Sequence, residues 1–259
     1  MAEANPMRAP EGATGALVLA SGEVLWGRGF GAAGHAVGEV CFNTAMTGYQ
    51  EVMTDPSYAG QIVTFTFPHI GNVGTNDEDI EAATAHALGC IVREDVTEPS
   101  NFRASSRFDE WLRKNGRFGL AGIDTRALTR KIRLDGAPNG VIVHAPDGVF
   151  DIPALIEKAK AWPGLEGMDL AKDVTVDESY DWQGGPWRLG FGYGEEGLEE
   201  KRPHVVAIDY GAKRNIFRNL VKAGAKVTVL PATASFADVM AEGPDGFFLS
   251  NGPGDPAAT

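Results

Sequence analysis

From residue 204 to residue 250 the chain alternates short apolar strands with amphipathic helices, and this alternation constrains its fold more than any other feature. Strand-like segments at 204–210, 226–230 and 246–250 enclose helical patterns at 213–223 and 236–241. Because strands joined through helices pair in parallel, the pattern predicts a parallel sheet with right-handed crossovers. The apolar residues of the first helix that are expected to face the sheet are Ile216, Phe217, Leu220 and Val221.

The last of these strands runs directly into a loop of turn-forming residues, Asn251-Gly252-Pro253-Gly254-Asp255-Pro256. A plain turn is one interpretation, because every residue in the loop favours turns. Ligands of open α/β sheets, however, bind outside the carboxyl ends of the strands. Since Gly252 and Gly254 leave backbone N–H groups free of side-chain cover, the alternative is a cradle for an oxyanion or a carboxylate.

Residues 15–149 follow a different pattern, in which short β-rich segments are separated by glycines. Strands are expected at 16–20, 24–27, 38–42, 61–67, 88–92 and 140–144, and helices at 108–115 and 125–134. Asp124 is placed to cap the second of these helices, and Leu128 and Ile132 fall on one face of it. This arrangement predicts a mixed α+β domain rather than a nucleotide-binding repeat.

A further helix is expected from about residue 153 to 161, followed by a Gly-, Glu- and Trp-rich connector or exposed hairpin at 181–202. We therefore divide the chain into a first domain at 12–180, a linker at 181–203 and an incomplete second domain at 204–259. A sheet of three strands exposes an edge and leaves apolar faces uncovered, so the second domain is expected to be cut through its middle.

Composition limits the partners and the chemistry of the chain. A net charge of -12 and a pI near 4.9 disfavour nucleic acid and anionic membranes as main partners. Cys41 and Cys90 lie in apolar strand-like contexts and are interpreted as buried structural thiols. The histidines show no metal-ligand spacing, and we expect no metal. Without a signal peptide or a membrane-spanning stretch, the chain is expected in the cytoplasm.

Seven passages carry recognisable motifs: Phe42–Glu51, Thr54–Tyr58, Phe67–Gly74, Gly122–Arg126, Gly167–Lys172, Asp209–Ile216 and Asn251–Pro256. In this order they closely resemble the small, glutamine-hydrolysing subunit of carbamoyl-phosphate synthase, over nearly the whole chain. The resemblance implies a swivelling β/β/α domain, followed by the first part of a class I glutamine amidotransferase domain with a flavodoxin-like parallel sheet.

The resemblance also implies an activity. In this family a Cys-His-Glu triad of the second domain hydrolyses glutamine to ammonia. The ammonia passes through a tunnel to a large subunit, which makes carbamoyl phosphate from bicarbonate and ATP for arginine and pyrimidine synthesis. The expected partners are therefore the large subunit and L-glutamine. No cofactor is expected on this chain, and ATP and Mg²⁺ are expected on the large subunit, because no phosphate loop appears here.

Three residues match glutamine-binding positions of the family. Ser57 matches the residue that reaches from the first domain to the substrate, and Gly252 and Gly254 match the glycines of the second. The Gly252 N–H is suited to stabilising the tetrahedral oxyanion. The Gly254 N–H and the Ser57 hydroxyl are suited to the α-amino-acid end of glutamine. Ser57 is not expected to be a nucleophile, since no histidine sits in a motif that would deprotonate it.

The chain departs from the family in two respects. Ala45 stands where many relatives carry Ser, and the family's catalytic Cys, His and Glu, which follow the Asn251–Pro256 passage, are missing from the 259 residues. Neither Cys41 nor Cys90 sits in a nucleophile elbow. We expect no catalytic residue in this chain, no ammonia release by it alone, and a Gly-x-Cys-x-Gly-like sequence in any reading frame that continues past Thr259.

Two alternatives remain. The chain is either part of the glutaminase subunit or a non-catalytic module that docks on the large subunit through its N-terminal domain. A class I amidotransferase serving anthranilate or GMP synthesis is disfavoured by the passages between Phe42 and Gly74, because those enzymes lack this N-terminal domain.

Overall fold

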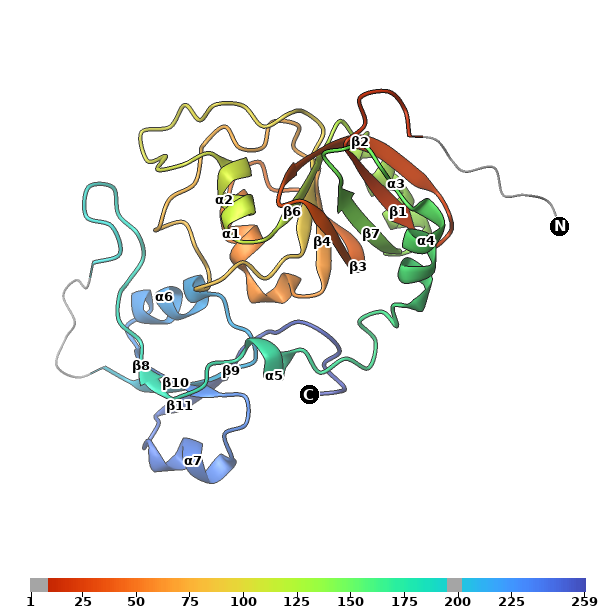
Figure 1. The fold of residues 1–259 in the computed structure, drawn as a ribbon. Helices are drawn as coiled ribbons and strands as arrows, with labels where there is room; N and C mark the ends of the chain where they lie inside the picture. The colour runs from red at the N-terminus through yellow and green to blue at the C-terminus, as the bar shows by residue number, and fades with distance from the viewer. Residues whose placement is uncertain (1–8, 195–201) are drawn as a thin grey trace. The chain divides into compact units, whose positions relative to one another are not determined.

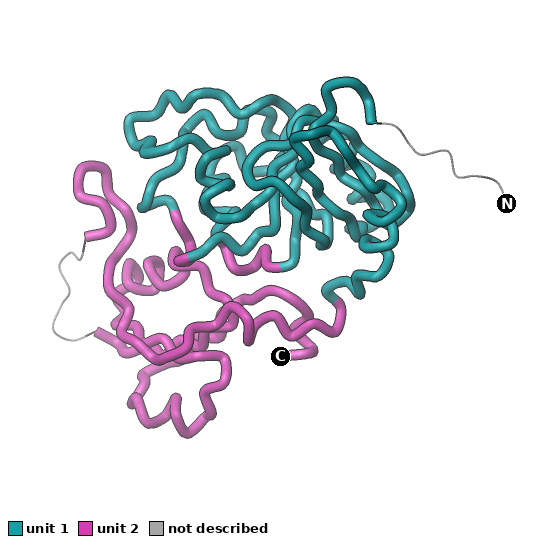
Figure 2. The backbone as a smooth tube through the Cα atoms, viewed as in Figure 1, with its two compact units in different colours: residues 1–54, 60–79, 84–165 teal, residues 55–59, 80–83, 166–259 magenta. Residues whose placement is uncertain are grey.

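The structure is a computed structural model that describes residues 9–194 and 202–259, and it separates into two compact units (Figure 2). The first unit comprises the residues up to 54 together with 60–79 and 84–165. The second unit comprises 166–259 together with two short segments from far earlier in the chain, 55–59 and 80–83. By its contacts the stretch 166–180 belongs to the second unit, whereas the sequence analysis assigned it to the first domain; the domain boundary at 180 stays a prediction.

Seven strands close into a barrel in the first unit (Figure 1). They are β1 (Gly15–Leu19), β2 (Val24–Gly31), β3 (Gly34–Asn43), β4 (Gln61–Phe65), β5 (Gly89–Ile91), β6 (Phe118–Ala121) and β7 (Asn139–His144). Their order around the barrel is β1-β2-β6-β5-β4-β3-β7. The pairs β3–β4, β4–β5 and β5–β6 are parallel and the remaining pairs antiparallel. All six expected strands are present, and β6 was missed because its four residues show no alternation.

The helices of the first unit are α1 (Tyr49–Thr54), α2 (Phe108–Lys114), α3 (Thr125–Asp135) and α4 (Ile152–Ala161). Since alternate strand residues point to opposite faces, Leu17 and Leu19 enter the barrel core while Ala16 and Val18 face α4. Leu128 and Ile132 of α3 join the barrel core, and the Asp124 carboxylate accepts from the Ala127 N–H as the predicted cap. The Thr47–Glu51 stretch leads into α1.

The second unit is built on a four-stranded sheet with the order β11-β9-β10-β8. Its strands are β8 (Tyr180–Asp181), β9 (His204–Asp209), β10 (Lys226–Pro231) and β11 (Gly246–Leu249), and its helices are the 3₁₀ turn η1 (Pro56–Tyr58), α5 (Ala171–Val174), α6 (Arg214–Lys222) and α7 (Phe236–Ala241). As predicted, β10 and β11 run parallel to β9. The expectation of three strands was wrong, because β8 adds an antiparallel edge beside β10.

Strand β8 was not predicted because two residues cannot show a period. In the structure it pairs with β10, and the Thr228 hydroxyl donates to the Asp181 carboxylate at 2.7 Å. The expected linker at 181–203 thus begins inside the sheet. Its residues 195–201 lie outside the described residues. Residues 1–8, where no signal peptide is expected, lie outside them as well.

The apolar face of α6 packs on the sheet as expected. Phe217 is buried beside Ala207 and Val227, and Ile216, Leu220 and Val221 pack against this cluster. On the edge strand β11, by contrast, Phe247 and Leu249 are 67% and 60% exposed. The predicted uncovered apolar face is therefore present. In the described part of the chain no helix combines the length and the apolarity needed to cross a bilayer.

Candidate functional site

The sheet order of the second unit identifies where a ligand would bind. From β9 the chain goes first to β10 on one side and then to β11 on the other, so the strand order reverses at β9. In open α/β sheets the crevice outside the carboxyl ends of the strands at such a reversal is the usual binding site. The loops that follow β9 and β11 flank this point.

The loop after β9 is organised by the buried carboxylate of Asp209. One carboxylate oxygen accepts from the N–H groups of Gly211, at 2.9 Å, and Ala212, at 2.6 Å, and the other accepts from the Val176 N–H at 3.2 Å. Gly211 has a φ of 110°, and a Cβ there would lie 2.9 Å from Cδ of Pro253. Glycine is required because the loops after β9 and β11 approach each other at this residue.

The loop after β11 is anchored to β9 by Ser250. Its N–H donates to the Ile208 carbonyl, and its hydroxyl accepts from the Tyr210 N–H at 2.9 Å. A Cβ on Gly252 would overlap the Tyr210 carbonyl oxygen, so this residue must be glycine for packing alone. Gly254 has a φ of 79°. Within residues 9–194 and 202–259, neither the Gly252 nor the Gly254 N–H donates a hydrogen bond, so both are available to a ligand.

Asp255 fixes the far end of the same loop against the Gly167–Lys172 passage. Its carboxylate accepts from the Ala257 N–H at 2.8 Å and the Gly167 N–H at 3.0 Å, and its own N–H donates to the Met168 carbonyl. These two amide donors hold the pKa of Asp255 below its ordinary value. The passage at 167–172 therefore supports the loop.

Ser57 lies in the short segment 55–59 that belongs to the second unit. The Asp55 carboxylate accepts from the Ser57 N–H at 2.9 Å and caps the turn η1. The Ser57 hydroxyl accepts from the side-chain amide of Asn251 at 2.6 Å. The structure thus brings Ser57 to the residue that precedes Gly252, although the two are almost two hundred positions apart in the sequence. What Ser57, Gly252 and Gly254 bind stays a prediction.

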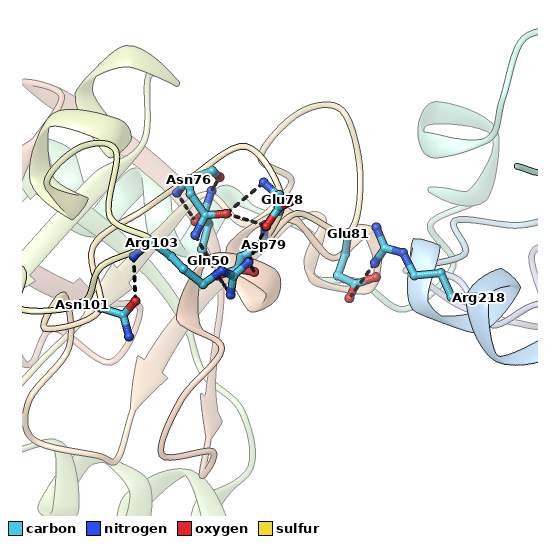
Figure 3. A network of polar contacts seen from close by, with 8 residues as sticks. All are labelled: Gln50, Asn76, Glu78, Asp79, Glu81, Asn101, Arg103 and Arg218. Atoms are coloured by element: carbon cyan, nitrogen blue, oxygen red, sulfur yellow. Dashed lines mark hydrogen bonds and ion pairs between the residues drawn. The ribbon is translucent and has the colours of Figure 1, made fainter. Parts of the chain in front are cut away.

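A second long-range anchor was missed by the sequence analysis. The carboxylate of Glu81 accepts from the Asn215 N–H at 2.8 Å. Figure 3 shows its ion pair with the Arg218 guanidinium, which lies 3.8 Å away. Glu81 thereby caps α6, whose own N-cap residue Lys213 makes no side-chain cap bond. Burial is the largest cause of a raised pKa at Glu81. The one available signal was a helix that starts without a capping side chain.

The passages Phe42–Glu51 and Phe67–Gly74 meet in the first unit. The Tyr49 hydroxyl donates to the Gly74 carbonyl at 2.6 Å. The Gln50 amide, drawn with Asn76 in Figure 3, donates to the Asn76 carbonyl at 2.6 Å. These buried bonds hold the backbone at residues 74–76 in place. The two passages therefore have a structural role here.

Neither thiol of the chain is suited to nucleophilic chemistry. Burial raises the pKa of Cys41 in β3 to about 12, and it raises the pKa of the fully buried Cys90 in β5 as well. Thiolates are the reactive form, so both groups are inert near neutral pH. Among the described residues no group of three or more His, Cys, Asp or Glu side chains is arranged to hold a metal ion.

Two family models match the chain. Residues 17–142 match "Carbamoyl-phosphate synthase small chain, CPSase domain", and residues 206–259 match "Glutamine amidotransferase class-I". The first match covers most of the barrel. The second begins within β9 and includes the loops after β9 and β11.

Curated relatives match almost the whole chain. The carbamoyl phosphate synthase small chain of Zymomonas mobilis is 68% identical over 94% of this chain and 65% of its own length. Those of Mesorhizobium japonicum and Caulobacter vibrioides are 60% and 57% identical, over 98% and 96% of this chain and 64% of each relative. The chain therefore spans just under two thirds of the length of these relatives.

Proposed function

Because this chain belongs to the carbamoyl-phosphate synthase small chain family, we propose that it is part of the glutamine-hydrolysing subunit of the synthase and supplies part of its glutamine site. The observation that carries the proposal is the bond between Ser57 and Asn251, which joins the 55–59 segment to the loop of Gly252 and Gly254. The three residues that the resemblance implicates thus come from two distant parts of the chain and lie in one unit.

Each residue has a role that its chemistry supports. Gly252 and Gly254 have N–H donors without a partner among the described residues, in the loop that flanks the strand reversal, where an oxyanion or a carboxylate is best stabilised. The Ser57 oxygen accepts from Asn251, so its hydroxyl hydrogen is left to donate to the substrate carboxylate. We assign Gly252 to the oxyanion of the tetrahedral intermediate, and Gly254 and Ser57 to the α-amino-acid end of L-glutamine.

The remaining steps belong to groups outside these residues. Since the half-buried Cys41 thiol and the buried Cys90 thiol are both protonated, residues 1–259 alone do not attack the glutamine amide. In the proposed complex the ammonia passes to a large subunit, which holds ATP and Mg²⁺ and forms carbamoyl phosphate from bicarbonate. The product serves arginine and pyrimidine synthesis in the cytoplasm.

The test uses a chimera in which residues 1–259 are followed by the remaining C-terminal part of the Zymomonas mobilis relative. We expect the chimera to release ammonia from L-glutamine and residues 1–259 alone to release none, as measured by coupled glutamate dehydrogenase. Ammonia release by residues 1–259 alone would contradict our account of the two thiols. A folded chimera that binds a large subunit but releases no ammonia would favour the docking-module alternative.

In the same chimera, Ser57→Ala removes one hydrogen bond to a charged substrate group. Such a bond contributes roughly 1.5 kcal/mol or more, so we expect the KM for glutamine to rise about tenfold with little change in kcat. Ser105→Ala, which changes an exposed serine of the first unit, is the matched control. An unchanged KM in the Ser57 variant would remove Ser57 from the site.

A further inference from the structure

A basic groove of about 780 Å³ lies in the first unit, and its lining includes none of the residues assigned above. We call it the arginine groove. Its lining consists of four arginines, four threonines, Pro68 and Leu134; the arginines are Arg93, Arg126, Arg130 and Arg133, and the threonines are Thr44, Thr66, Thr125 and Thr129. All of them come from α3 or from the segments that follow β3, β4 and β5.

Helix α3 presents three of these arginines on one side. Leu128 and Ile132 point into the barrel core, while Arg126, Arg130 and Arg133 follow the spacing i, i+4, i+7 of a single helix face. Within the described part of the chain none of these three arginines has an ion pair, whereas Lys131 of the same helix pairs with Glu23 at 2.9 Å. A cluster of unpaired guanidinium groups is unexpected in a chain whose net charge is -12.

The composition of the groove favours a protein partner over a small ion. All four cations are arginines, which bind carboxylates through two parallel bonds and are enriched at protein interfaces, where lysine is depleted. Leu134 at the groove is 73% exposed and offers apolar contact area beside the charges. The threonine hydroxyls add neutral hydrogen-bonding groups.

We propose that the arginine groove is the docking surface for an acidic segment of the large subunit. The identity of the partner rests on the proposed function, whereas the location and the charge of the surface rest on the groove itself. Since like charge on both sides would oppose association, the complementary segment must carry Asp or Glu side chains. Docking is then sensitive to ionic strength, because charges at an interface are screened by salt.

The experiment measures the affinity of residues 1–259 for a purified large subunit by biolayer interferometry. We expect Arg126→Glu combined with Arg130→Glu to weaken binding about 100-fold, as reversal of two interfacial charges does. Arg113→Glu combined with Lys114→Glu changes the net charge equally on the exposed end of α2, outside the groove, and should leave the affinity within about twofold of the wild-type value. Circular dichroism checks that both variants fold.

A milder pair guards against misfolding of the charge reversal. Arg126→Gln combined with Arg130→Gln removes both positive charges without adding negative ones and should still weaken binding about tenfold. If wild-type residues 1–259 bind the large subunit and all three variants bind equally well, the arginine groove is not the docking surface, while the proposed function stands. If the wild-type chain does not bind at all, the partner in the proposed function is wrong.

A third arm addresses a small anion. Inorganic phosphate is titrated into the chain by calorimetry at constant ionic strength. We expect no saturable binding in the low millimolar range. Stoichiometric phosphate binding that is lost in the Glu variant, together with unchanged binding of the large subunit by that variant, would overturn the proposal in favour of a small-anion site.

Discussion

Gly252 contributes to the site through its backbone N–H and to the packing of the loop through its lack of a side chain. Among the described residues its N–H has no partner, which suits an oxyanion, but its missing side chain also lets the Tyr210 carbonyl approach. A Gly252→Ala variant would therefore displace the loop as well as disturb any bound ligand. Substitution of Ser57 tests the site more directly, because within the described chain its hydroxyl bonds only to the side chain of Asn251 and not to the backbone of the loop.

The two thiols give a second prediction at the residue scale. With the pKa of Cys41 raised to about 12, only about one molecule in 10⁴ carries the thiolate at pH 8. We expect iodoacetamide to leave both Cys41 and Cys90 unmodified in the folded chain at this pH and to modify both in urea, as read by intact mass. Rapid modification of the folded chain would contradict the raised pKa values of the two thiols.

At the scale of elements, the carboxyl ends of β9 and β10 are joined by one side chain from outside the sheet. The Thr175 hydroxyl donates to the Asp209 carbonyl at 2.6 Å and accepts from the Ala232 N–H at 2.8 Å. The strands' own ladder ends here, so Thr175 extends the pairing by side-chain bonds. Asp209 therefore takes part in both features: its carbonyl accepts from Thr175, and its carboxylate accepts from the N–H groups of the loop after β9.

Thr175→Val tests the bridge because it keeps the shape of the side chain and removes both bonds. We expect the free energy of unfolding to fall by roughly 1–3 kcal/mol, since a polar N–H and a carbonyl lose their partners. Thr175→Ser keeps the hydroxyl and should cost less than half as much. The measurement is urea unfolding followed by tryptophan fluorescence; a loss in Thr175→Val no larger than that in Thr175→Ser would contradict a dominant role for the hydroxyl.

At the scale of the whole molecule, the compact units do not follow the order of the chain. Segments 55–59 and 80–83 lie between barrel strands in the sequence but belong to the second unit, and each forms an ion pair there. Asp55 lies 3.6 Å from the Lys213 ammonium, and Glu81 caps α6 and pairs with Arg218. Ser57 owes its position beside Asn251 to these anchors.

The Glu81 anchor predicts a pH dependence of stability. Burial raises the pKa of Glu81 in the folded state, against the opposing effects of the Asn215 N–H and of Arg218. The folded chain therefore holds the Glu81 proton more tightly than the unfolded chain does. The stability from this proton is complete below the unfolded pKa of about 4.3 and is lost as the pH rises through the raised folded pKa.

Glu81→Gln removes this titration and keeps an acceptor for the Asn215 N–H. We expect the free energy of unfolding of the wild-type chain, relative to the variant, to decrease as the pH rises from about 4.3 through the raised pKa. Urea unfolding at several pH values measures the difference, and Glu157→Gln, at an exposed position of α4, controls for the loss of a carboxylate. A difference that stays constant or grows with pH would contradict the raised pKa.

The sequence by itself determined the elements whose pattern is local. The apolar runs of β1 and β9, the apolar face of α6 and the cap at Asp124 are all written in neighbouring residues, and the motifs were enough to indicate the family. Elements without a local pattern were missed: β6 has four residues and β8 has two.

Only the tertiary structure decided which distant residues share a unit. The resemblance assigned Ser57 a position that reaches toward the glycine loop, but the bond to Asn251 and the cap that Glu81 provides for α6 depend on how the chain folds back on itself. Hydrogen bonds and ion pairs between residues more than a hundred positions apart leave no periodic trace, because their geometry is set by packing and burial rather than by spacing along the chain.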